Sequence, residues 1–100
     1  MTKPYTIQQI QSIVSPIAKE HGVSSVALFG SYATGTATAD SDVDLKIEKG
    51  RLRSLFQISG LRLELEDALH VPVDLITSES SDKAFLASIA KDEVLLYREA

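Results

Sequence analysis

The sequence predicts an α/β (α+β) protein of one domain, spanning residues 1–100. Helix-like and strand-like segments alternate along the chain, 44% of the residues are hydrophobic, and 24% are charged. A chain of this length and composition can bury a single core. Because it has no cysteine, neither a disulfide framework nor a cysteine-based zinc site can hold the fold.

The first predicted element is an amphipathic helix. Apolar residues recur at helical spacing over residues 7–18, Thr6 and Gln9 form a capping-box pattern, and Gly22 is typical of a helix end. Pro16 interrupts the pattern and favours a kink or a division into two pieces. We therefore expect a helix here with reduced continuity.

The remaining elements follow from apolar periodicity and turn residues. We expect strands at Val26–Phe29, from Val43 to Lys49, at His70–Ile76 and at Glu93–Tyr97, a long helix at Leu52–Leu69, and a helix capped by Ser80 or Ser81 that carries Phe85, Leu86 and Ile89. In the second strand Val43, Leu45 and Ile47 share one face, whereas Asp42, Asp44, Lys46 and Glu48 share the other. The carboxylates therefore point the same way.

Composition limits the functional classes. The net charge is −4, which disfavours direct nucleic-acid binding because phosphate contacts depend on clustered Lys and Arg. The N-terminus lacks the apolar core of a secretory signal, and no apolar run is long enough to cross a membrane. A cytoplasmic location is the default expectation.

A Gly-Ser pair and two carboxylates form the most informative motif. Gly30-Ser31 ends the first strand, and Asp42-Val43-Asp44 follows after ten residues. Glycine permits a sharp turn and a close phosphate approach, and serine adds a hydroxyl donor. A helical turn beginning there would also favour phosphate.

A third carboxylate, Asp74, lies in the next predicted strand and could converge on Asp42 and Asp44. Like charges brought together repel unless a cation lies between them. Magnesium suits such a site because it combines protein carboxylates with substrate phosphates and water. The pattern therefore indicates a site for a metal-bound nucleoside triphosphate.

These motifs resemble the DNA polymerase beta-like nucleotidyltransferase superfamily. The run GSYATGTATADSDVDL, the later Val73-Asp74-Leu75 and the short length are similar to its minimal nucleotidyltransferases, the MNT proteins. The resemblance extends roughly from Ile7 to Tyr97. It implies the nucleotidyltransferase fold, with a mixed sheet of about four strands and helices packed mainly on one side.

The resemblance also implies site roles. Residues matching Asp42 and Asp44 hold two magnesium ions, the one matching Asp74 contacts the catalytic metal and helps to deprotonate the attacking hydroxyl, and those matching Gly30 and Ser31 hold the triphosphate of ATP. All three aspartates are thus expected metal ligands and catalytic residues. Two ions can stabilise the entering and the leaving oxygen of an in-line displacement.

One position departs from the family pattern. The family commonly continues Gly-Ser-x-Ala-Arg-Gly, but Thr34 stands at the arginine position. This raises the question of nucleotide affinity and of full activity. Lys46, on the carboxylate face, is a secondary candidate as a neighbouring charge.

The resemblance further implies a partner. MNT proteins are often paired with a HEPN-domain protein, and members of such pairs act as antitoxins that transfer AMP to a tyrosine of the HEPN toxin. Two alternatives remain open: a weakly active module that neutralises or scaffolds its partner by contact alone, and a transferase subunit for a small molecule such as an aminoglycoside. The sequence leaves the acceptor, the nucleotide, the oligomeric state and the choice between magnesium and manganese undetermined.

Overall fold

A computed structural model describes residues 4–100 and shows four helices and four strands in that range. The elements are α1 (Ile7–His21), β1 (Ser25–Phe29), α2 (Ser31–Thr34), β2 (Val43–Glu48), α3 (Leu55–Leu69), β3 (Val73–Thr77), α4 (Lys83–Ala90) and β4 (Val94–Arg98). The predicted alternation of helices and strands is confirmed.

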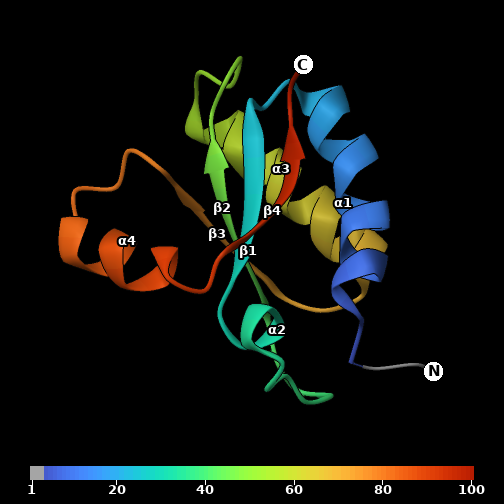
Figure 1. The fold of residues 1–100 in the computed structure, drawn as a ribbon. Helices are drawn as coiled ribbons and strands as arrows, with labels where there is room; N and C mark the ends of the chain where they lie inside the picture. Colours follow the sequence, from blue (N-terminus) through green and yellow to red (C-terminus); the bar gives the residue numbers. More distant parts are fainter. Residues whose placement is uncertain (1–3) are drawn as a thin grey trace.

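The four strands form one mixed sheet in the order β3-β2-β1-β4. Strand β1 is antiparallel to both β2 and β4, and β2 is parallel to β3. Helices α1 and α3 lie together against one face, whereas α4 lies apart from them (Figure 1). This matches the expected sheet with helices mainly on one side.

The core lies between this covered face and helices α1 and α3. Every second residue of β2 points into it, namely Val43, Leu45 and Ile47, each fully buried. From the helices come Ile10, Val14 and Ala18 of α1 and Leu61, Leu65 and Leu69 of α3. Because strand side chains alternate, the same packing directs Asp44 and Lys46 to the opposite face. We call this the open face because α1 and α3 leave it uncovered, although Phe85 of α4 packs edge-on against Phe29 there.

Helix α1 is capped as predicted. Thr6 and Gln9 form the capping box, and Gly22 ends the helix in the left-handed conformation with φ of +80°. The helix continues through Pro16 as one element, so a division into two pieces is not observed. Pro16 and Ser12 are exposed, so the carbonyl that loses its helical partner can bond to water.

The third helix begins later than predicted, at Leu55 instead of Leu52. Ser54 and Gln57 form a second capping box, which sets the start of the helix, and Leu52 is buried from the preceding loop. Leu55 and Phe56, expected on the apolar face, are 81% and 91% exposed. The periodicity over the first turn was therefore misleading.

The later boundaries also differ from the predicted ones. Strand β3 starts at Val73 because His70 ends α3 in the left-handed conformation and Pro72 has no N–H to donate. Asp82, rather than Ser80 or Ser81, caps α4 by accepting a hydrogen bond from the Phe85 amide at 3.0 Å.

Candidate active site

The sheet register brings two of the predicted carboxylates side by side. Asp44 of β2 and Asp74 of β3 are direct partners in the parallel pair. The pairing starts where the Val43 amide donates to the Pro72 carbonyl at 2.9 Å. Adjacent strands lie about 4.8 Å apart, so residues in register present their side chains together on one face.

The start of β3 is held by a helix residue. The Val73 amide donates to a carboxylate oxygen of Glu66 at 2.9 Å, and Arg62 lies 3.1 Å from the other oxygen of Glu66. Glu66 therefore connects α3 to the strand that carries Asp74.

Asp44 also lies directly against Gly30. Strand β1 ends at Phe29, the antiparallel partner of Asp44, and Gly30 follows with φ of +76°. A Cβ built on Gly30 would lie 2.1 Å from Asp44 Oδ2, which is too close for any side chain. Both the backbone conformation and the available space therefore require glycine here.

The turn after Gly30 is a short helix, α2. The Ala33 and Thr34 amides donate to the Gly30 carbonyl at 3.0 and 3.1 Å, so the helical hydrogen bonds start at Ala33. The amides of Ser31 and Tyr32 precede the first helical hydrogen bond, as at any helix N-terminus. Ser31 is the first residue of α2 and directly follows Gly30, which lies against Asp44.

The surroundings of Asp44 favour its protonated form. Burial raises the pKa of Asp44 from 3.8 to about 6, and the nearby carboxylates of Asp74 and Asp42 add to the rise. Asp44 is half-buried, whereas Asp42 and Asp74 are exposed. Negative charge at Asp44 is therefore unfavourable in the metal-free chain.

A hard divalent cation fits this donor set. Within residues 4–100, no three His, Cys, Asp or Glu side chains are arranged to hold a metal ion as they stand. Magnesium, however, commonly uses only one or two protein carboxylates and completes its shell with phosphates and water. The adjacent Asp44 and Asp74, with the raised pKa of Asp44, match that requirement.

The comparison with known families decides the class of protein. A family model described as polymerase beta, nucleotidyltransferase matches residues 9–100. The chain is a nucleotidyltransferase of the polymerase beta family. The family resemblance expected from the motif is confirmed.

Curated relatives of this nucleotidyltransferase cover most of its length. A Methanocaldococcus jannaschii protein named as a candidate protein adenylyltransferase, MJ0435, is 35% identical over 89 residues, which cover 89% of this chain and 90% of the relative. Protein adenylyltransferase MntA of Thermococcus cleftensis is 32% identical over 93 residues, which cover 89% of this chain and 94% of the relative.

Solved structures share the fold. A structure described as a candidate minimal nucleotidyltransferase has a TM-score of 0.77 at 26% identity, over 93% of this chain and 98% of that one. A toxin-antitoxin structure with AMP-PNP has a TM-score of 0.78 at 21% identity, over 89% and 73% of the two chains. A structure of a tri-AMPylated Shewanella oneidensis HEPN toxin in complex with MNT antitoxin has a TM-score of 0.73 at 18% identity, over 94% and 74%.

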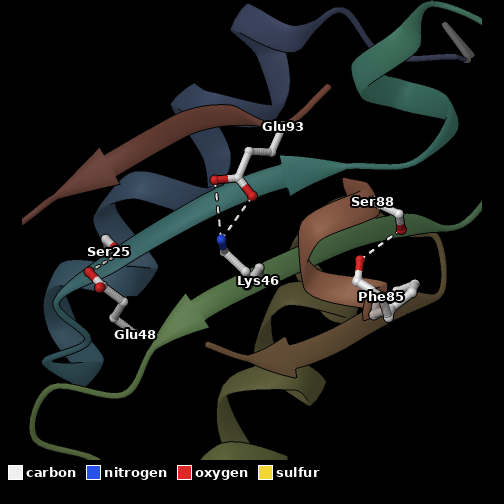
Figure 2. Close-up of polar contacts among 6 residues, drawn as sticks. All are labelled: Ser25, Lys46, Glu48, Phe85, Ser88 and Glu93. Atoms are coloured by element: carbon white, nitrogen blue, oxygen red, sulfur yellow. Dashed lines mark hydrogen bonds and ion pairs between the residues drawn. The ribbon is translucent and has the colours of Figure 1, made fainter. Parts of the chain in front are cut away.

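The nucleotidyltransferase site has no positively charged side chain at position 34, because threonine stands there instead of the arginine of the family pattern. Thr34 is exposed, and its hydroxyl lies 3.0 Å from the Thr36 hydroxyl and 3.4 Å from the Gly30 carbonyl. Lys46 lies on the carboxylate face but contacts Glu93 (Figure 2). Glu93 was not foreseen, because it follows Lys46 by 47 residues and no local pattern connects the two.

Among residues 4–100, no helix is long and apolar enough to span a bilayer.

Proposed function

We propose that this nucleotidyltransferase is a magnesium-dependent protein adenylyltransferase that transfers AMP from ATP to a tyrosine hydroxyl of a HEPN partner and thereby acts as an antitoxin. The observation that carries the proposal is the register pair Asp44–Asp74, in which Asp44 lies against Gly30. Relatives named as protein adenylyltransferases support the transfer of AMP to protein. A similar fold in complex with an AMPylated HEPN toxin supports the class of partner.

The residues of the site divide the chemistry between them. Asp42, Asp44 and Asp74 would hold the cation, and magnesium, when bound, supplies positive charge that stabilises the entering and leaving oxygens. Gly30 allows the phosphates to approach the main chain, and Ser31 offers its hydroxyl and its amide to the triphosphate. These contacts hold the α-phosphate in line with the acceptor.

In this proposal Asp74 receives the acceptor proton. In the transfer, the acceptor oxygen forms a bond to the α-phosphorus, the bond from that phosphorus to the β-phosphate oxygen breaks, and pyrophosphate leaves. The proton of the attacking hydroxyl passes to the Asp74 carboxylate, which is exposed and therefore accessible to an incoming side chain. Atoms and charge balance with ATP and a hydroxyl as the only reactants.

The proposal is tested by co-expression with the product of a neighbouring HEPN reading frame and intact-mass measurement after incubation with ATP and magnesium. A mass increase of the partner by one or more AMP units is the expected result. The control is Asp67→Asn, an exposed carboxylate of α3 on the helical side, which should transfer normally. An unmodified partner with the native chain would refute the transferase proposal.

One observation favours a second candidate, a binding module that neutralises its partner by contact alone. Thr34 replaces the arginine of the family pattern. Its hydroxyl forms hydrogen bonds with the Gly30 carbonyl and the Thr36 hydroxyl. This candidate predicts suppression of the toxin without AMP transfer. The same mass measurement, combined with toxin activity in the complex, distinguishes the two functions.

A further inference from the structure

A polar pocket lies on the open face of the sheet, next to the carboxylate site. Its volume is about 230 Å³. Small side chains create it: Ser25 and Ala27 of β1 face Glu48 and Lys46 of β2 across the antiparallel ladder. Leu95 of β4 pairs with Ala27 from the other side. The open face is therefore hollow where β1 carries its smallest residues.

A partly buried ion pair forms the rim of this pocket. Lys46 Nζ lies 2.8 Å from Glu93 Oε1 and 3.2 Å from Oε2, and the two side chains are only 20% and 26% exposed. Further along the same face, the Ser25 hydroxyl donates to Glu48 at 2.6 Å. Figure 2 shows both contacts over the same side of the sheet.

The Glu93 carboxylate retains capacity to accept a hydrogen bond. Its Oε1 is buried, and within the described residues no donor reaches it in hydrogen-bond geometry, although the Lys46 ammonium is close. The Lys46 ammonium at 2.8 Å compensates the charge of this oxygen. A carboxylate oxygen has two lone pairs, so it can still accept a hydrogen bond from a ligand.

The size of the pocket argues against a nucleotide. Small-molecule and cofactor sites commonly enclose about 300–1,000 Å³, so this pocket suits one side chain better than ATP. Ala27 and Leu95 provide an apolar base, whereas Lys46, Glu93 and Ser25 provide polar edges. An aromatic ring matches the apolar base of this pocket.

The strand register connects the pocket to the chemistry. Lys46 follows Asp44 by two residues on the same strand and the same face, a separation of about 7 Å along the strand. The pairing of β1 with β4 shifts between Val26 and Ala27, beside the pocket. Such irregularities are common next to active sites, where they redirect side chains.

We propose that this pocket is the acceptor subsite, which binds the side chain of the tyrosine that receives AMP. Lys46, held by Glu93, is a positioning residue that orients the phenol ring so that its hydroxyl points toward the Asp44–Asp74 pair. This inference rests on the proposed function, because it assumes a protein hydroxyl as acceptor. ATP then occupies the region of Gly30 and Ser31, outside the pocket.

Binding is tested first, without nucleotide or metal, by titrating N-acetyl-tyrosinamide into the isotopically labelled chain and following its amide NMR signals. Shifts are expected for residues 25–28, 46–48 and 93–96. They should disappear in Lys46→Met and persist in Lys46→Arg. Lys49→Met is the matched control, because it removes a surface ion pair with Glu79 (2.9 Å) outside the pocket.

Two results of this titration would overturn the subsite: no saturable shifts at all, or the same shifts in Lys46→Met. Shifts of the same residues by ATP alone would reassign the pocket to the nucleotide. Lys46→Met leaves Glu93 unpaired and could fail to fold. The double variant Lys46→Met with Glu93→Gln removes both charges and should likewise lose the shifts.

Transfer kinetics provide a second test. For Lys46→Met we expect the KM for the protein acceptor to rise about tenfold, with kcat and the Kd of magnesium–ATP nearly unchanged. This is the result expected when a contact that is equally strong in the ground state and the transition state is lost. An unchanged KM would refute the positioning role. If the native chain binds the tyrosine probe in the pocket but transfers no AMP, the proposed function fails while the subsite stands.

Discussion

Replacing Asp44 by asparagine separates the catalytic use of this carboxylate from its effect on stability. Burial and the neighbouring carboxylates raise the pKa of Asp44 from 3.8 to about 6. The folded chain therefore binds more protons than the unfolded chain between these values, and stability falls as the pH rises through this window. Asparagine carries no such charge. Asp44→Asn should thus stabilise the metal-free protein at pH 7.5 and make little difference below pH 4.

The size of this effect follows from the pKa shift. A shift of about 2 units corresponds to an upper value of about 3 kcal/mol at 1.36 kcal/mol per unit. Asp44 is only half-buried, and solvent screening reduces this to about 1–2 kcal/mol. For a domain of this size, each kcal/mol moves the melting temperature by about 4–8 °C.

The assay is thermal and urea unfolding with a chelator at pH 7.5 and pH 4, for the native chain, Asp44→Asn and the control Asp67→Asn. Added magnesium should stabilise the native chain at pH 7.5 and have little effect on Asp44→Asn, which should also lose AMP transfer. Equal or lower stability of Asp44→Asn at pH 7.5 would refute the electrostatic reasoning. Transfer at the native rate would refute the metal-ligand assignment.

Three further substitutions test the other parts of the site. Asp74→Asn should reduce transfer more than magnesium–ATP binding, because Asp42 and Asp44 still hold the metal; complete loss of binding by calorimetry, with the fold intact, would make Asp74 an essential ligand instead. Gly30→Ala should reduce transfer and should lower the free energy of unfolding by about 1–3 kcal/mol, because the added Cβ meets the Asp44 carboxylate and the backbone at this position is strained for alanine. Unchanged unfolding curves would contradict this. Thr34→Arg should tighten magnesium–ATP binding about tenfold, more at low salt, because a charge-assisted hydrogen bond contributes about 1.5–3 kcal/mol and is screened by ions. Equal affinity at both salt concentrations, with altered partner binding, would place this residue at the partner surface.

Local patterns predicted most of the elements. The capping box at Thr6 and Gln9 and the helix end at Gly22 are short-range interactions, and the structure shows both. A second capping box, at Ser54 and Gln57, sets the start of the third helix, whereas apolar spacing alone predicts a start at Leu52. Local hydrogen bonds are more decisive than periodicity at helix ends because each one satisfies a specific backbone donor.

The sequence by itself determined the family motif and the alternation that directs Asp44 and Lys46 to one face. These depend on spacing along the chain. The requirement for glycine at position 30 follows from its φ of +76° and the approach of Asp44 in the structure. Only the tertiary structure decided that Asp44 lies in register with Asp74 and that Lys46 contacts Glu93. It also decided that the small residues of β1 leave a pocket on the open face. The physical reason is that strand register and the contacts between β2, β3 and the segment before β4 are set by how the shared core packs, and residues 30 to 47 positions apart carry no local pattern that encodes this packing.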